Sequence, residues 1–326
     1  MTQTRRTLLT AATAAMLAGS LPLVAVAQSY PEQPIRIFVG FPPGGSTDTI
    51  GRMIAEGLGA QLGQNVIVEN VPGAGSNIAA HRVARADPDG YTLLLATAGT
   101  HAINASIYPD MPFDHIEDFA PVASVATSAN VLIVRPDFPA TTLEAFVEMV
   151  SAGDERVTVA IPGNGSTPHM TTELLNRATG GNLTHVNYPG GGPALVDLMA
   201  GRVDMLFEGT MSAAGHIEAG SVMPLGISSP ERNELLPDVP AIGEVIDGFE
   251  AGAWWGLVAP AGTPESVIAT LNEAANAALS TDALQARFAD LGASTGSGSA
   301  ADFARHIVDE TAKWSAIIEE AGVTLE

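Results

Sequence analysis

A plan that occurs twice along the chain limits the possible folds more than any other feature. Each copy reads as strand, loop, helix, strand, loop, helix and strand, beginning near residue 35 and again near residue 157. Within each copy, Gly-rich loops break β-rich apolar runs, and helical periodicity follows the loops. Such alternation predicts parallel strands joined by right-handed crossovers. The sequence therefore predicts an α/β protein of two lobes, each a mostly parallel sheet flanked by helices.

The two copies define the expected elements and domains. Strands are expected at 35–39, 66–68 and 91–96 in the first copy, and at 157–161, 183–186 and 203–207 in the second. Extended apolar runs at 122–134 and 225–260 lie outside the plan, so we expect them to cross between lobes as hinges. We expect residues 254–258 to form a hinge or a core strand. Lobe 1 then comprises residues 30–127 with 248–326, and lobe 2 comprises residues 128–247.

The N-terminus has the pattern of a targeting segment. Arg5 and Arg6 precede an uncharged stretch that ends in Ala25-Val26-Ala27, a small-x-small site for signal peptidase. A membrane anchor is the alternative, but Ala and Thr dominate the stretch, and polar residues follow it at once. Both ordinary secretion and twin-arginine export fit the basic pair. The sequence predicts a cleavable signal peptide at 1–27 and, in a bacterium, a periplasmic mature chain that does not insert into the membrane.

Composition excludes several classes of function. The chain contains no cysteine, which rules out disulfide scaffolds, zinc–thiolate sites and thiol nucleophiles. Its 14 Lys+Arg against 36 Asp+Glu give a net charge of −22, which argues against nucleic acid or an anionic membrane as partner. Lys313 is the sole lysine, and its surroundings fit neither Schiff-base chemistry nor phosphate binding. The seven histidines show no metal-ligand spacing, so no metal and no cofactor are expected.

Four Gly-rich loops are candidates for ligand binding. They lie at 44–46, 73–76, 163–166 and 190–192, at matching places in the two copies. Where such a loop opens a helix, free N–H groups and the helix dipole favour an anion. None of the four contains Arg or Lys. Anion binding would therefore rest on backbone N–H groups, hydroxyls and bridging waters.

The residues around these loops and around a hydrolase-like motif argue against an enzymatic function. No loop contains Gly-Lys-Ser/Thr, and Ile78 stands where a dinucleotide fingerprint needs Gly or Ala. The G-x-S-x-G match at 292–296 follows a helical stretch, whereas a nucleophile elbow needs a preceding strand. Ser166 and His169 could belong to an esterase triad. However, Ser166 stands where it would cap a helix, which occupies its hydroxyl.

Seven motifs spread from Tyr30 to the C-terminal region carry a family resemblance. They lie at 30–35, 41–48, 68–75, 87–93, 236–240, 255–264 and 310–314. Through them the chain resembles the periplasmic solute-binding proteins of tripartite tricarboxylate transporters, the Bug family. The resemblance implies a type II periplasmic binding fold, a non-enzymatic monomer, and capture of a small carboxylate for membrane permease subunits. One departure is Asn187-Tyr188-Pro189-Gly190, where members often carry Lys or Arg before the glycine.

Two other functions remain open beside transport: a ligand-presenting sensor protein, and an esterase using Ser166 and His169. The sequence does not name the carboxylate.

We expect one ligand carboxylate to lie against residues 44–46 and its opposite face to meet residues 165–166. Glu208 would accept a hydrogen bond from an amine or hydroxyl of the ligand, or face solvent. Asp48 would support the first loop. The candidate ligand-binding residues belong to the loops and neighbouring strand ends: Phe41, Gly44, Gly45, Ser46, Gly75, Thr97, Thr100, His101, Gly165, Ser166, His169, Tyr188 and Glu208.

Overall fold

The structure is a computed structural model that describes residues 30–322 except 109, 154–155, 163–164 and 189. Residues 33–326 form one compact unit, so the predicted lobe boundaries stay a prediction. In the segment before this unit, the Tyr30–Pro31 peptide is cis. The predicted signal peptide lies outside the described residues. Among the residues described, no helix combines the length and apolar character that a bilayer crossing requires.

The first repeat follows the predicted plan. Its elements are β1 (Ile35–Val39), α2 (Ser46–Leu62), β2 (Val66–Asn70), α3 (Asn77–Ala84) and β3 (Thr92–Thr97). The strands are parallel and lie in the order β2-β1-β3. Helix α2 buries Ile50, Met53, Ile54 and Leu58, the apolar stripe that its sequence periodicity predicts.

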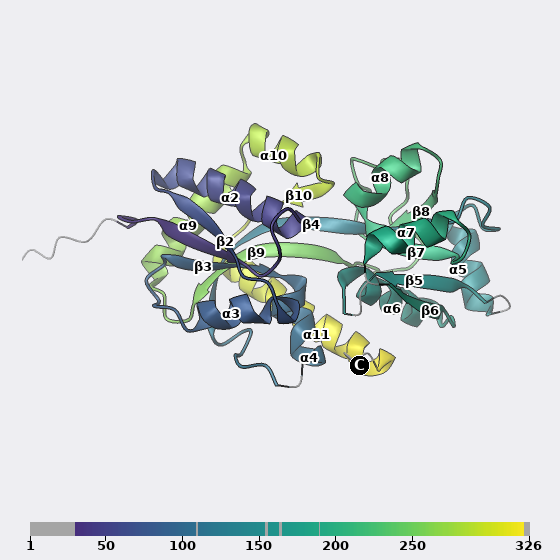
Figure 1. The fold of residues 1–326 in the computed structure, drawn as a ribbon, viewed down its shortest axis with the longest axis horizontal. Helices are drawn as coiled ribbons and strands as arrows, with labels where there is room; N and C mark the ends of the chain where they lie inside the picture. The colour runs from purple at the N-terminus through teal and green to yellow at the C-terminus, as the bar shows by residue number, and fades with distance from the viewer. Residues whose placement is uncertain (1–29, 109, 154–155, 163–164, 189, 323–326) are drawn as a thin grey trace, which may run out of the picture. The chain divides into compact units, whose positions relative to one another are not determined.

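The second repeat has the same topology. Its elements are β5 (Thr158–Pro162), α6 (Thr167–Thr179), β6 (Thr184–Tyr188), α7 (Gly191–Met199) and β7 (Met205–Gly209). Its strands are also parallel, in the order β6-β5-β7. The repeated plan is therefore confirmed in both its elements and its strand order (Figure 1).

Two long strands connect the repeats, and both run antiparallel to their neighbours. The 16-residue β4 (Phe119–Val134) pairs with β9 (Gly252–Pro260) along its first part and with β7 and β8 (Met223–Ile227) along its second. Strand β9 also pairs with β3, so residues 254–258 form a core strand. One path therefore runs β2-β1-β3-β9-β4-β7-β5-β6. The parallel arrangement holds inside each repeat only.

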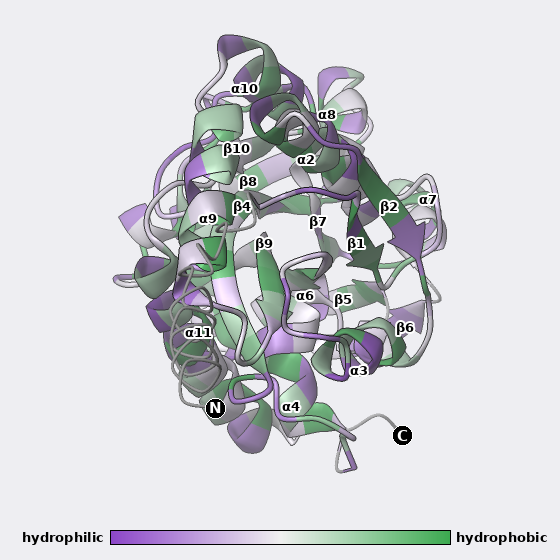
Figure 2. Cartoon of the chain, turned by 90° about the vertical axis from the view of Figure 1, so that its left-hand side faces the viewer, coloured by the Kyte–Doolittle hydropathy of each residue, from purple (hydrophilic) through white to green (hydrophobic). Residues whose placement is uncertain are grey.

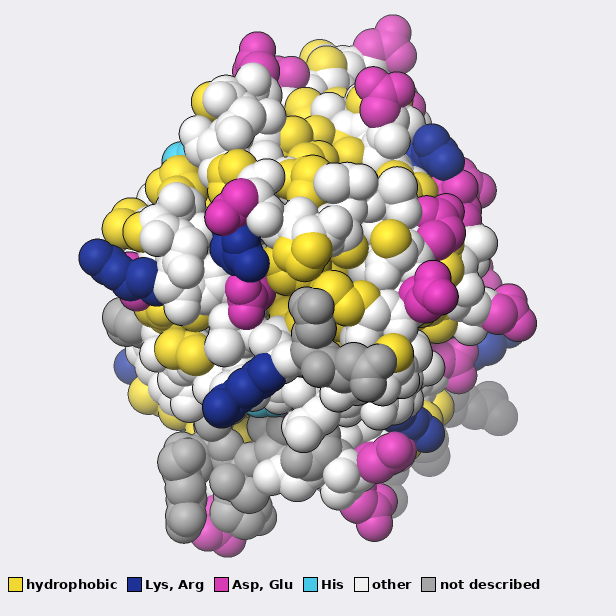
Figure 3. Space-filling view, turned by 90° about the vertical axis from the view of Figure 1, so that its right-hand side faces the viewer, with side chains coloured by type: hydrophobic (Ala, Val, Ile, Leu, Met, Phe, Trp, Pro, Cys, Tyr) yellow, Lys and Arg dark blue, Asp and Glu magenta, His cyan; other side chains and the backbone are white. Residues whose placement is uncertain are grey.

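The remaining elements cover the sheet or join its strands. They are η1 (Ala74–Ser76), η2 (Gly99–Ile103), α4 (Asn104–Ile107), α5 (Leu143–Ala152), α8 (Thr210–Glu218), η3 (Ile242–Glu244), α9 (Glu265–Leu279), α10 (Asp282–Ala289), β10 (Ala293–Thr295) and α11 (Ala300–Ala321). Hydrophobic residues concentrate on the strands, while the surrounding helices carry hydrophilic residues as well (Figure 2). On the face shown in Figure 3, acidic side chains outnumber basic ones, as the net charge of −22 requires.

The G-x-S-x-G match at 292–296 is not a nucleophile elbow. Ser294 lies in the short strand β10, which follows helix α10 and pairs with β4. Gly296 follows β10 and donates its N–H to the carbonyl of Val125 at 2.8 Å. The segment is therefore an edge of the sheet rather than a strand-to-helix turn.

Candidate functional site

The strand order places the candidate site at corresponding ends of the two repeats. In each repeat the first strand lies between the second and the third, so the chain winds first to one side and then to the other. Ligands of open α/β sheets bind outside the carboxyl ends of the strands at such switch points. The loops that leave β1 and β5 contain Gly44–Ser46 and Gly165–Ser166. The first is exposed and the second half-buried.

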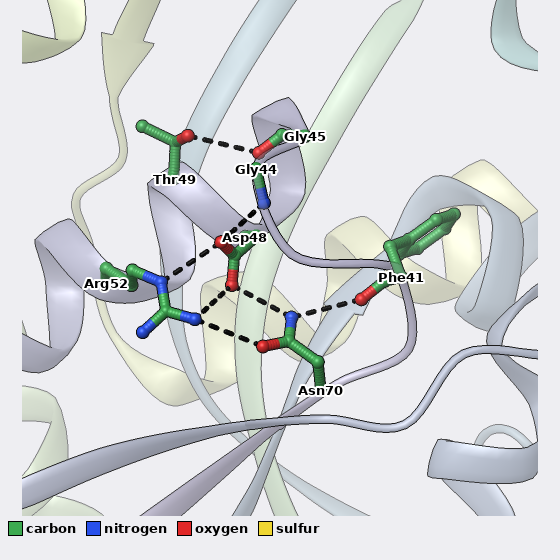
Figure 4. A network of polar contacts seen from close by, with 7 residues as sticks. All are labelled: Phe41, Gly44, Gly45, Asp48, Thr49, Arg52 and Asn70. Atoms are coloured by element: carbon green, nitrogen blue, oxygen red, sulfur yellow. Dashed lines mark hydrogen bonds and ion pairs between the residues drawn. The ribbon is translucent and has the colours of Figure 1, made fainter.

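A buried carboxylate organises the first loop (Figure 4). Asp48 accepts hydrogen bonds from the Gly44 N–H at 2.8 Å and from Asn70 Nδ2 at 2.8 Å. Arg52 donates to both carboxylate oxygens, at 2.9 and 3.0 Å. Asn70 Nδ2 also donates to the carbonyl of Phe41 at 3.0 Å, and the Phe41 ring points away from the carboxylate. These contacts confirm that Asp48 supports the loop.

This network decides which groups of the first loop remain available to a ligand. The hydrogen bond from Arg52 is the main reason that the pKa of Asp48 falls to about 2, so its carboxylate is ionised at neutral pH. The Gly44 N–H donates to this carboxylate and is thus engaged within the protein, so contact between Gly44 and a ligand stays a prediction. In the described chain, no side chain caps the start of α2. The first-turn N–H groups that begin at Ser46 therefore face the site without a side-chain acceptor.

The second loop ends in a capped helix. Ser166 is the N-cap of α6, and its Oγ accepts the N–H of His169 at 3.3 Å. The cap uses the hydroxyl as an acceptor, so its O–H can still donate to a ligand. A Cβ built on Gly165 would lie 3.2 Å from Cδ1 of Ile107, which shows that α4 packs against this loop.

His169 supports the second loop from within the protein. Its side chain is buried, its Nδ1 accepts the N–H of Gly165 at 3.0 Å, and its Nε2 lies 3.3 Å from Oε1 of Glu173. Both ring nitrogens are thus engaged away from Ser166 Oγ, and the esterase alternative loses its base. The His169 ring faces the protein interior, and its contact with a ligand stays a prediction.

Three side chains beside this loop have the composition of a metal site. The ligand atoms of His169, Glu173 and His185 lie within 4.8 Å of one another, and two histidines with one carboxylate occur in zinc enzymes. A backbone N–H can only donate, so the bond from Gly165 leaves Nδ1 of His169 without a proton. The neutral ring then carries its proton on Nε2. A metal at Nε2 would move the proton of the neutral ring to Nδ1, where it would face the Gly165 N–H, so the geometry argues against a metal at this nitrogen.

The predicted wall of the site lies mostly inside the protein. Thr100 and His101 have no exposed surface, and Thr97 retains 7%. Thr100 Oγ1 accepts the N–H of Thr97 at 3.0 Å, and the His101 ring packs edge-on against Phe119 with centroids 4.7 Å apart. Burial lowers the pKa of His101 to about 3, so this ring is neutral. Thr100 and His101 both complete the core behind β3, and their contact with a ligand stays a prediction.

Three further candidates, Glu208, Tyr188 and Gly75, contact other parts of the protein. Oε2 of Glu208 is buried and has no hydrogen-bond partner among the described residues, and burial raises the pKa of this carboxyl. A Cβ on Gly191 would lie 2.3 Å from Oε2, so this oxygen packs against the start of α7 rather than facing solvent. The Tyr188 hydroxyl donates to Asp197 at 2.9 Å. Gly75 is exposed, and its carbonyl accepts from Asn104 Nδ2 at 3.0 Å.

A cavity of about 490 Å³ lies elsewhere, beside Trp254, His306 and Lys313. Lys313 pairs with Glu310, and Arg232, also in the lining, pairs with Glu244 at 2.7 Å. Acidic side chains therefore already neutralise both of these cations, Glu310 from within the lining and Glu244 from outside it. We place the candidate site at the two loops, because their helix starts still offer N–H and O–H donors.

Comparison with known families shows which family the chain belongs to. The model of a family described as "Tripartite tricarboxylate transporter family receptor" matches residues 50–323. The chain belongs to this receptor family. It is 35% identical over 302 residues to Protein BugT of Bordetella pertussis, covering 92% of this chain and 93% of the relative.

Solved structures of similar proteins confirm the type II periplasmic binding fold. MatC from Rhodopseudomonas palustris with bound malate is 35% identical, with a TM-score of 0.72 over 89% of this chain and 100% of MatC. The R. palustris protein Rpa4515 with adipate is 34% identical, with a TM-score of 0.77 over 91% of this chain and 100% of that protein. Both structures therefore contain a dicarboxylate on a fold like that of this receptor family member.

Several supporting residues of this receptor were not identified from sequence. Asn70 and Arg52 complete the Asp48 network, and Glu173 with His185 surrounds His169. A local signal existed for two of them, because Asp48–Arg52 and His169–Glu173 are i,i+4 pairs on helices. Asn70 and His185 come from neighbouring strands, and only the parallel pairing brings them to the loops.

Proposed function

We propose that this protein is a periplasmic receptor that binds a small organic dicarboxylate between the Gly44–Ser46 and Gly165–Ser166 loops. The observation that carries the proposal is the matched position of these loops, each at the carboxyl end of a central strand and at the start of a helix. The malate and adipate in structures of similar proteins support a dicarboxylate. We propose delivery to a membrane permease rather than signalling, because a transporter defines the family.

The donors left free by the fold suit a carboxylate. Ser46 can donate through its backbone N–H and its hydroxyl at the uncapped start of α2, and Ser166 can donate its O–H. Both helix N-termini add a favourable dipole. The guanidinium of Arg52 is committed to Asp48, so it orients the first loop instead of pairing with the ligand. With no general base beside Ser166, we propose binding without chemical turnover.

Removing either serine hydroxyl is expected to weaken dicarboxylate binding. Each lost hydrogen bond to a charged group costs ~1.5–3 kcal/mol, which is roughly ten- to hundredfold in affinity. A melting screen of ligand-stripped protein with malate, adipate and related dicarboxylates first identifies a ligand. Calorimetry then compares wild type with Ser46→Ala and Ser166→Ala. Ser151→Ala, an exposed change on α5, is the matched control. Wild-type affinity in both loop variants would place the ligand elsewhere.

Export is expected to remove residues 1–27. The small-x-small site at Ala25-Val26-Ala27 motivates cleavage before Gln28. The measurement is the intact mass of protein recovered from the periplasmic fraction, with Ala27→Arg as a variant that blocks the site. A mass that retains residues 1–27 in the wild type would contradict both the cleavage and the proposed location.

A further inference from the structure

His169 and Glu173 form a short chain of contacts that ends at the second ligand loop. Gly165 has a φ of 73°, a conformation that glycine adopts at little cost. Its N–H donates to Nδ1 of His169 at 3.0 Å, and the next residue, Ser166, caps the same helix that carries His169. The imidazole therefore fixes the backbone immediately before the hydroxyl that we assign to the ligand.

The contact works in only one tautomer of the His169 ring. Nδ1 accepts from Gly165 only when the ring proton is on Nε2, because a proton on Nδ1 would face the Gly165 N–H donor to donor. Nε2 lies 3.3 Å from Oε1 of Glu173, and that oxygen is also 3.4 Å from Nδ1 of His185. Glu173 is 7% exposed, and its carboxylate lies at ion-pair distance from Nε2, where its negative charge favours a proton on that nitrogen. The carboxylate therefore favours the tautomer that holds the loop.

We propose that Glu173 is a positioning residue for ligand binding: it fixes the His169 tautomer, which holds Gly165 and orients the Ser166 hydroxyl. This rests on the proposed function, because it assumes that the ligand meets the Gly165–Ser166 loop. Glu173 itself does not reach the ligand. Its effect on affinity passes entirely through the acceptor at Nδ1 of His169.

A double-mutant cycle separates this relay from a general structural role. Glu173→Leu removes the acceptor and is expected to weaken dicarboxylate binding about tenfold, the value of one hydrogen bond of ~1.4 kcal/mol. Glu173→Gln keeps an acceptor oxygen and should largely restore affinity. His169→Asn places Oδ1 near the position of Nδ1 and accepts from Gly165 whatever Glu173 does. In that background, Glu173→Leu is therefore expected to have no further effect on affinity.

Equal losses from Glu173→Leu in both backgrounds would overturn the relay. Glu310→Gln, at a second buried glutamate that accepts from Trp254 and Trp314, tests whether lower stability alone weakens binding. Nitrogen NMR of the unliganded protein reads the tautomer directly: the relay predicts a protonated Nε2 in the wild type and a mixture in Glu173→Leu. A protonated Nδ1 in the wild type would also refute it.

Two further experiments separate an error in the ligand position from an error in the relay. If Ser166→Ala binds the dicarboxylate with wild-type affinity, the proposed ligand position is wrong. The NMR measurement then still shows which tautomer His169 adopts. If Zn²⁺ raises the melting temperature of the chelator-treated wild type but not of Glu173→Leu, the cluster binds a metal and the relay is wrong. The relay predicts no Zn²⁺-dependent stabilisation and no loss of affinity after chelation.

Discussion

Acidification from pH 7 to pH 3 is expected to destabilise the protein by about 4 kcal/mol through His101 alone. This ring has no exposed surface, and burial lowers its pKa from 6.5 to about 3. Between these values the unfolded chain binds a proton that the folded chain does not. The free energy of unfolding is therefore greatest above pH 6.5 and falls as the pH drops toward 3. Burial also lowers the pKa of His115 and His306, which adds to the same trend.

Denaturant unfolding at pH 7, 5.5 and 4.5 measures this loss, with His101→Leu as the informative variant. The variant loses the hydrogen bond between Nδ1 of His101 and Oγ1 of Thr100, so it is less stable at pH 7. The slope of its unfolding free energy with pH should nevertheless be smaller than in the wild type. Asp48 does not affect the comparison between pH 7 and pH 4.5. Its pKa in the folded protein is about 2, below the ordinary 3.8, so its contribution to the free energy of unfolding is lost only below pH 4. Equal slopes in wild type and variant would contradict the assignment.

Gly296→Ala is expected to lower the free energy of unfolding by about 3 kcal/mol, because overpacking that forces backbone shifts typically costs ~1–3 kcal/mol and this contact is with backbone atoms. A Cβ at this position would lie 2.5 Å from the carbonyl carbon and oxygen of Ser124. That carbonyl belongs to β4, the strand that connects the two repeats, and the Gly296 N–H already bonds to Val125. Neither backbone can move without breaking the pairing of β10 with β4.

Gly215→Ala is the matched control for this prediction. Gly215 lies in α8, where a Cβ meets nothing within 4 Å, and alanine is the better helix former by roughly 1 kcal/mol. Thermal or denaturant unfolding of the two variants beside wild type is the measurement. Similar stabilities for Gly296→Ala and Gly215→Ala would show that the segment after β10 adapts more freely than its contacts indicate.

Local spacing is enough to predict the repeats and part of the second loop. The strands and helices of each repeat follow from apolar periodicity, and Ser166 was recognised as a cap because a cap acts within three residues. Pairing direction between distant strands leaves no local trace. The antiparallel course of β4 and β9 was therefore not predicted, although both were recognised as segments outside the repeats.

The burial of predicted site residues has the same physical origin, because it depends on strands distant in the sequence. His101 and Thr100 follow β3 as ligand-binding residues often follow a strand, but η2 turns them into the core, where Phe119 of β4 covers the histidine. Likewise, the sequence presents the Gly44 N–H as a free donor for a ligand, whereas in the structure it donates to Asp48, four residues later. A sequence shows which groups are near along the chain. It does not show which of them the distant strands enclose.

A crystal structure of the ligand-stripped protein soaked with the dicarboxylate of highest affinity tests the central claim most directly. The account predicts one carboxylate within hydrogen-bond distance of the Ser46 N–H or hydroxyl, with the Ser166 hydroxyl donating to the same molecule. Electron density for the dicarboxylate in the cavity beside Trp254, His306 and Lys313, with both loops empty, would contradict it.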